Sequence, residues 1–148
     1  MTSEAEAPGQ TPGREWVRGG EQGLPRVIGP YSLGVRTGPL VFTAGVVAVD
    51  SGRNVVGVGD IRAQTEQVFK NLSAVLERCG ATLRDVVKVT IWLRDFNDYA
   101  GMNEVYGRWF SEPEPVRACV RAELVQPQLL VEIEATAVTG ELDAVGSA

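Results

Sequence analysis

Two charged side chains on neighbouring predicted strands are the best candidates for chemistry in this sequence. Arg117 lies in the alternating run 115–124, and Glu132 lies in the alternating run 130–138. A planar guanidinium on a rigid strand binds a carboxylate through two parallel hydrogen bonds, which a lysine cannot do. A carboxylate on a neighbouring strand can orient a water molecule or transfer a proton. The pair therefore suggests a site for a small carboxylic acid whose other end undergoes hydrolysis.

A purely structural explanation competes with this hypothesis. Arg and Glu on the outer faces of neighbouring strands commonly form a solvated cross-strand pair that stabilises a sheet. Spacing alone favours this explanation over a catalytic site.

Both runs alternate with the period of two that is typical of half-buried strands. In the run 115–124 the even-numbered residues are apolar, and we expect them to face the core. The odd-numbered residues, which include Arg117 and Cys119, then form a polar face. In the run 130–138 the odd-numbered residues are apolar, and Glu132 lies on the polar side. We therefore expect the chemistry on the polar face of the two strands.

Composition excludes several classes of function. A net charge of −5 without a Lys/Arg cluster argues against nucleic-acid binding. The chain has no histidine, so acid–base chemistry falls to carboxylates, backbone groups or water, and we expect no metal site. Its two cysteines, Cys79 and Cys119, give no disulfide framework and favour a reduced, cytoplasmic protein. We expect neither a signal peptide nor a membrane-spanning segment.

The length of 148 residues fits one domain. Residues 1–25 are rich in Gly, Pro, Glu and Gln and are expected to form a flexible N-terminal tail. One domain is expected over residues 26–140, followed by a short C-terminal tail over residues 141–148.

Within this domain the sequence predicts a mixed sheet and two amphipathic helices. A β-hairpin is expected over residues 28–47, and a helix over residues 61–79 with Asp60 as its N-cap and Gly80 at its end. A β-branched strand over residues 86–93 follows, with its odd-numbered residues on one face. A second helix is expected over residues 98–110, with Asp98 as its N-cap. Its buried stripe is expected to comprise Met102, Val105, Tyr106, Trp109 and Phe110. Because a helix joins the hairpin to the strand 86–93, we expect a crossover connection and parallel pairing there.

The two helices are expected to cover the same face of the sheet. The other face is then too apolar for open water and too mixed for a core. Burial against copies of the same chain resolves this, so we expect a closed homo-oligomer with sites at the subunit junctions.

Five segments, in order and spanning roughly residues 27–139, carry a family resemblance. Together they resemble the RidA family, also called YjgF or reactive intermediate deaminases. The segments are Gly29-Pro30-Tyr31-Ser32, Phe42-Thr43-Ala44-Gly45, Asp95-Phe96-Asn97-Asp98-Tyr99-Ala100-Gly101-Met102-Asn103-Glu104-Val105-Tyr106, Pro115-Val116-Arg117-Ala118-Cys119-Val120 and Val131-Glu132-Ile133-Glu134-Ala135-Thr136-Ala137.

The resemblance implies a chorismate-mutase-like α+β fold, with a mixed β-sheet, two helices on one face, and a homotrimer whose sheets line a central barrel. It also implies a cofactor-independent deaminase that hydrolyses enamine or imine forms of 2-amino acids, such as 2-aminoacrylate, to a 2-keto acid and ammonia. Carried over by position, Arg117 binds the carboxylate of this small substrate and Glu132 positions the attacking water. The other substrate-binding residues would be Tyr31, Ala44, Gly45, Asn103 and Cys119.

The sequence departs from the deaminase pattern at several positions. Deaminase members commonly have Ser-Gly-Gln where this chain has Ala44-Gly45-Val46, and often Gln where Leu33 stands. The pocket is thus expected to be more apolar and differently shaped. This favours, as an alternative substrate, a larger and more apolar acid, in the manner of aminomuconate deaminases or biosynthetic relatives.

Three other roles are weaker alternatives. A ligand-binding trimer without turnover is opposed by the presence of both Arg117 and Glu132. The ribonuclease activity described for some family members is opposed by the acidic charge and the lack of histidine. Cys119 is not expected to be a nucleophile, because a strand cysteine beside apolar neighbours is usually unreactive.

Overall fold

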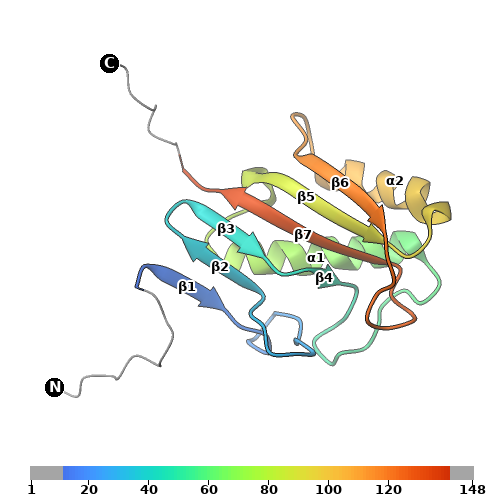
Figure 1. Ribbon diagram of the computed structural model, residues 1–148, viewed down its shortest axis with the longest axis horizontal. Helices are drawn as coiled ribbons and strands as arrows, with labels where there is room; N and C mark the ends of the chain where they lie inside the picture. The colour runs from blue at the N-terminus through green and yellow to red at the C-terminus, as the bar shows by residue number, and fades with distance from the viewer. Residues whose placement is uncertain (1–11, 141–148) are drawn as a thin grey trace.

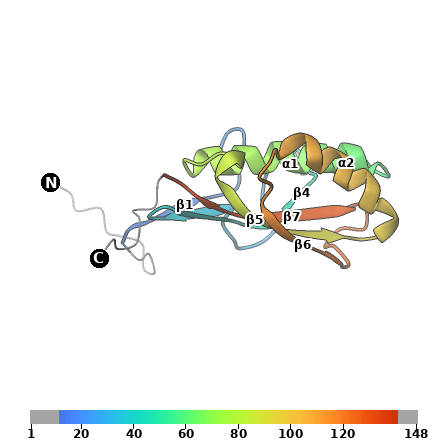
Figure 2. The ribbon, with the colours of Figure 1, turned by 90° about the horizontal axis from the view of Figure 1, so that it is seen from above.

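A mixed sheet runs through the computed structural model, which describes residues 12–140 (Figure 1). Its strands lie in the order β1-β2-β3-β7-β5-β6, and the short β4 also pairs with β7. The two α-helices cover one face of the sheet and leave the other open (Figure 2), so the predicted mixed sheet with two helices on one face is confirmed. The elements are β1 (Arg14–Val17), β2 (Gly34–Thr37), β3 (Leu40–Thr43), β4 (Val46–Val47), α1 (Ile61–Arg78), η1 (Leu83–Asp85), β5 (Val86–Leu93), η2 (Phe96–Asp98), α2 (Tyr99–Trp109), β6 (Val116–Arg121) and β7 (Val131–Val138).

Strand β7 lies at the centre of the sheet. It pairs antiparallel with β3 and β4 on one side and with β5 on the other. Helix α1 therefore connects the opening hairpin to β5 across β7, and the parallel pairing expected for this connection does not form. The parallel pair is β5 with β6, which are joined through α2.

Helix α1 begins and ends where the sequence predicts. The Asp60 side chain accepts a hydrogen bond from the backbone N–H of Ala63 at 3.0 Å, which caps the first turn. The helix ends before Cys79, and Gly80 then adopts a left-handed φ of 79°. Its buried stripe packs on the sheet and includes Val68, Phe69, Leu72, Val75 and Leu76.

Helix α2 buries the predicted stripe but begins differently from the prediction. Asp98 makes no capping hydrogen bond with its side chain, because its backbone is already helical and cannot take the extended conformation of a cap. Instead, Asp95 accepts a hydrogen bond from the backbone N–H of Asn97 at 2.8 Å and caps η2, which runs directly into α2. The buried residues towards the sheet and α1 include Met102, Val105, Tyr106 and Phe110.

In two strands the buried side chains differ from those that the alternation predicts. In β5, Val86 is buried and Val87 is exposed, because a β-bulge follows Val86. In β6, Val116 and Val120 are 69% and 43% exposed, so the prediction that they face the core is wrong. The register pairs the odd-numbered residues of β6 with buried residues of β5, and this puts its even-numbered residues on the open face.

The described chain is structured well before the predicted domain start at residue 26. Strand β1 pairs antiparallel with β2, and Val17 and Leu24 are buried. The prediction of a flexible tail over residues 1–25 is therefore wrong from Arg14 onward. Although the segment has few apolar residues, its strand pairing and the burial of Val17 and Leu24 hold it on the sheet. The beginning of that tail and the C-terminal tail predicted over residues 141–148 lie outside the described residues.

The open face of the sheet carries exposed apolar side chains from both halves of the molecule. Trp16 lies opposite Val35 in the sheet register, and Val35 lies opposite Phe42. Trp16 and Phe42 are exposed, as are Val116 and Val120 of β6. Exposed apolar surface spread across a sheet is typical of a protein interaction surface.

A bulge separates β3 from β4. Residues 43–45 lie opposite residues 134–135, so this side of the ladder has one extra residue. Where the backbone ladder is interrupted, the hydroxyl of Thr43 supplies a hydrogen bond in its place. It accepts from the N–H of Ala135 at 3.0 Å and donates to the carbonyl of Ala44 at 2.9 Å. The bulge thereby fixes the backbone of a segment that contains two predicted site residues.

Replacing Thr43 by valine should destabilise the protein, because valine keeps the shape but leaves the N–H of Ala135 without its acceptor. We expect a loss of about 1–2 kcal/mol in the free energy of unfolding, measured by urea titration. Thr43→Ser keeps the hydroxyl and is the matched control, so it should lose less. Equal urea midpoints for the two variants would show that the hydroxyl does not support the bulge.

Candidate active site

Arg117 lies on the edge strand β6, on the face that α2 covers. Its register partner in β5 is Val89, which is fully buried. The guanidinium carbon lies 4.7 Å from the centre of the Tyr106 ring and 5.7 Å from the centre of the Tyr99 ring. The Nη2 group donates a hydrogen bond to the Tyr99 hydroxyl at 2.9 Å. Contacts from α2 therefore hold the guanidinium in place.

An open pocket of about 480 Å³ lies beside this arginine. Its volume falls in the range of small-molecule sites. Within residues 12–140, the bond to Tyr99 is the one hydrogen bond of the Arg117 side chain, so other guanidinium N–H groups remain available to a ligand. We call this region the arginine half-site; its lining residues are Phe96, Tyr99, Arg117 and Cys119.

Cys119 forms part of the wall of the arginine half-site. Burial raises the pKa of its thiol, and the positive charge of Arg117 opposes that effect only in part. The thiol form therefore dominates at neutral pH, and a thiol is a weak nucleophile. This supports a packing role for Cys119 rather than covalent chemistry.

Glu132 lies on β7 beside Gly45, and these two residues form what we call the glutamate half-site. A methyl group at residue 45 would stand 2.5 Å from Oε1 of Glu132, so the glycine leaves the room that the carboxyl group occupies. Burial raises the pKa of Glu132, and the negative charge of Glu134 raises it further. A carboxyl group with a raised pKa is a stronger base than an ordinary glutamate, which favours proton transfer.

Arg117 and Glu132 lie on opposite faces of the sheet within one chain. In β5, Val89 is the register partner of Arg117, and Trp92 is the register partner of Glu132. Positions 89 and 92 are an odd number of residues apart, so their side chains point to opposite faces. The expectation of one polar face carrying both groups is therefore wrong for a single chain, which holds two separate half-sites.

The other predicted site residues divide between these half-sites. Asn103 lies one helical turn after Tyr99 on α2 and lowers the pKa of its phenol, so it belongs with the arginine half-site. Ala44 precedes Gly45 and is half-buried at the glutamate half-site. The backbone N–H of Ala44 donates to Leu33 O at 2.8 Å, which brings the loop carrying the exposed Tyr31 towards this half-site.

Two of the unusual residues do not reshape a pocket. Leu33 and Val46 are 4% and 2% exposed and belong to the core, so the expectation that they make the pocket more apolar is wrong for this chain. Ala44 is the departure that remains near the surface.

Two tyrosines of the arginine half-site region were not among the predicted site residues. Tyr99 and Tyr106 flank the guanidinium of Arg117. The sequence does contain a signal, because residues 99, 103 and 106 are spaced i, i+4, i+7 and share one face of a helix. Tyr106 is expected in the core on this spacing, and it is indeed largely buried, yet it also supports Arg117.

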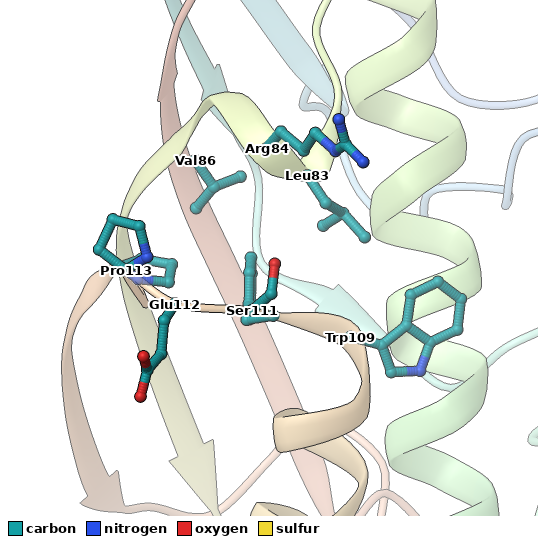
Figure 3. A pocket seen from close by; sticks show the side chains of 9 residues that line it. Leu83, Arg84, Val86, Trp109, Ser111, Glu112 and Pro113 are labelled. Atoms are coloured by element: carbon teal, nitrogen blue, oxygen red, sulfur yellow. The ribbon is translucent and has the colours of Figure 1, made fainter.

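A second pocket, of about 520 Å³, lies between η1, the start of β5 and the loop from α2 to β6 (Figure 3). It contains none of the predicted site residues. The side chains of Arg84 and Glu112 extend in opposite directions in Figure 3, and the Trp109 indole N–H donates to Glu66 at 2.9 Å. Since its charged groups do not converge, we place the candidate site at Arg117.

Metal-binding clusters and membrane-spanning helices are both absent from the described residues. Within residues 12–140, no cluster of His, Cys, Asp and Glu could hold a metal ion. None of the helices in this segment is both long and apolar enough to cross a membrane.

Comparison with known proteins identifies the family. The family model described as Endoribonuclease L-PSP matches residues 22–139. A RutC family protein of Pyrococcus abyssi is 44% identical over 113 residues, covering 76% of this chain and 89% of the relative. The 3-aminoacrylate deaminase RutC of Acinetobacter baylyi is 37% identical over 116 residues (78% and 92%). A 2-iminobutanoate/2-iminopropanoate deaminase of Dermatophagoides farinae is 39% identical over 114 residues (77% and 89%).

Solved structures agree with these sequence relatives. RidA from an Antarctic Psychrobacter species is 33% identical, with a TM-score of 0.77 over 84% of this chain and 99% of that chain. TdcF of E. coli, solved with bound serine, is 32% identical, with a TM-score of 0.76 over 85% of this chain and 99% of that chain. The chain therefore belongs to the RidA family, which confirms the resemblance seen in the sequence.

Replacing Glu132 by glutamine should change how stability depends on pH. A carboxyl group whose pKa is raised by folding stabilises the native state below its unfolded pKa of about 4.3, and that contribution is lost as pH rises through the raised pKa. Glu132→Gln should therefore melt at a higher temperature than the wild type near neutral pH. This advantage should shrink as the pH falls through the raised pKa of Glu132 and should have disappeared below about pH 4. A melting-temperature difference that does not vary with pH would refute the raised pKa.

Proposed function

We propose that this protein is a cofactor-independent deaminase that hydrolyses the imine or enamine form of a 2-amino acid to a 2-keto acid and ammonia. The observation that carries the proposal is the guanidinium of Arg117, fixed against α2 and exposed to an open pocket. Two relatives named as deaminases, of 3-aminoacrylate and of 2-iminobutanoate, support this reaction class. The serine bound in TdcF supports an amino-acid-like ligand.

In the proposed reaction the two half-sites have separate roles. Arg117 binds the substrate carboxylate through paired N–H groups and so fixes the adjacent C2 carbon. Glu132 accepts a proton from water as the water oxygen bonds to C2 of the protonated imine. It then returns that proton to the nitrogen of the carbinolamine. As the C2–N bond breaks to release ammonia, the Glu132 carboxylate takes the remaining hydroxyl proton, which leaves a keto group at C2. The imine is already electrophilic, so these steps need only carboxylate binding and proton transfer.

We infer that a complete site needs two copies of the chain. Arg117 and Glu132 lie on opposite faces of one sheet, so a second chain has to bring its glutamate half-site to the arginine half-site of the first. The exposed apolar side chains of the open face, including Trp16, Phe42 and Val116, support association through that face. A closed homotrimer would supply three equivalent sites.

A larger and more apolar substrate is the second candidate. Phe96 and Tyr99 are both exposed beside Arg117, and they offer aromatic surface to a side chain longer than that of 2-aminoacrylate. Ala44 lacks the hydroxyl that is common in deaminase members at this position. Both observations favour an imino acid with a bulky apolar side chain over the smallest substrates.

Arg117→Ala should lower kcat/KM for imine hydrolysis by about 100-fold, the value of a lost charge-assisted hydrogen-bond pair. The measurement is keto-acid release from imines generated in the assay by an amino-acid oxidase, with small and bulky amino acids compared. Arg117→Lys should recover activity only in part, because an ammonium cannot form the paired geometry. Arg108→Ala removes an exposed arginine of α2 and is the charge control. Equal rates for Arg117→Ala and wild type would end the carboxylate-binding hypothesis.

Mixing two inactive variants tests whether each site is shared between chains. If Arg117→Ala and Glu132→Ala chains are unfolded together and refolded in equal amounts, about one site in four should contain both wild-type residues. The mixture should then show about a quarter of wild-type activity, while each variant alone stays inactive. A mixture as inactive as its components, with the oligomer intact by light scattering, would mean that one chain supplies both residues.

A further inference from the structure

Tyr99 is placed to control Arg117 directly. It is the first residue of α2, its side chain is 41% exposed, and it lines the arginine half-site. Its hydroxyl oxygen accepts the hydrogen bond from Nη2 of Arg117 at 2.9 Å. Because the oxygen is the acceptor in this bond, the phenolic proton remains available to a second acceptor, such as a carboxylate bound to the same guanidinium.

The surroundings of Tyr99 lower the pKa of its phenol. The Asn103 side chain has the largest lowering effect, followed by the positive charge of Arg117, whereas desolvation and then Cys119 act in the opposite direction. On the other side of the guanidinium, burial raises the pKa of Tyr106. Of the two tyrosines against Arg117, Tyr99 is therefore the one that ionises first.

We propose that Tyr99 is a positioning residue that sets the affinity of Arg117 for the substrate carboxylate, aiding binding as a phenol and competing with the substrate as a phenolate. As a phenol it fixes one Nη group and shares its proton with the bound carboxylate. As a phenolate it becomes an anion in direct contact with the guanidinium. It then forms an ion pair with Arg117 in competition with the substrate carboxylate. The proposal rests on the proposed function, because it takes Arg117 as the carboxylate-binding group.

The two roles predict a crossing pattern for Tyr99→Phe. Phenylalanine keeps the ring in the half-site but can neither accept the bond from Arg117 nor ionise. At neutral pH the variant should bind a carboxylate about three- to tenfold more weakly than the wild type, the range for one hydrogen bond. Towards the pKa of tyrosine, near 10, the wild type should lose affinity while the variant does not.

The test is the binding of 2-oxobutanoate, a keto acid that needs no turnover, measured by ligand-observed NMR at about pH 7 and about pH 9.5. Wild type, Tyr99→Phe and Arg117→Ala are compared as full chains, and melting curves establish that each is folded. The expected result is weaker binding by Tyr99→Phe at the lower pH and convergence or reversal at the higher pH. A loss of fold alone would not produce affinities that cross with pH.

Two other outcomes are decisive in different ways. If Tyr99→Phe binds as tightly as the wild type at neutral pH, or loses affinity in parallel with it as the pH rises, the role of Tyr99 is refuted. A parallel loss would assign the pH dependence to another group, such as Cys119, and would leave the proposed function intact. If Arg117→Ala binds 2-oxobutanoate as the wild type does, the carboxylate site itself is refuted, and both proposals fail together.

Discussion

The stacking of the Arg117 guanidinium on the ring of Tyr106 joins an edge strand to a helix. An edge strand normally has unpaired backbone N–H and C=O groups, and its side chains have few neighbours. Here β6 pairs with β5 on one side, and the guanidinium of Arg117 is held against α2 by two aromatic rings. This gives the chain a fixed positive group at the margin of the molecule, where a ligand and a second chain can both reach it.

The alternation of side chains along a strand then determines how the site can be completed. Arg117 shares the covered face with α2, and Glu132 shares the open face with exposed apolar residues. A carboxylate with a raised pKa on an open apolar face is unfavourable for an isolated chain. In the proposed assembly another copy covers that face, and burial of Glu132 would then serve both the association of the chains and the proposed proton transfer.

Local signals in the sequence predicted most of the fold. They failed where the register between neighbouring strands determines which side chains are buried. The cap at Asp60 and the glycine that ends α1 are local, and both were predicted. Which face of β6 is buried depends on its pairing with β5. Because Val116 and Val120 are apolar, they were predicted to face the core, but both are exposed. Strand alternation and residue type singled out Arg117 and Glu132, and the family resemblance supplied the other site residues. Their division between two faces could be seen only from the sheet topology. Tyr99 was overlooked because a tyrosine on an amphipathic helix is most simply explained as packing.

The tight approach of Glu132 to Gly45 also bears on how this site could change during evolution. A side chain at residue 45 would displace the carboxyl group, which stands 2.5 Å from the position of a methyl group there. The exposed rings of Phe96 and Tyr99 line the separate arginine half-site. New substrate preferences can therefore arise at these aromatic rings, whereas the glutamate half-site has no room for a side chain at residue 45.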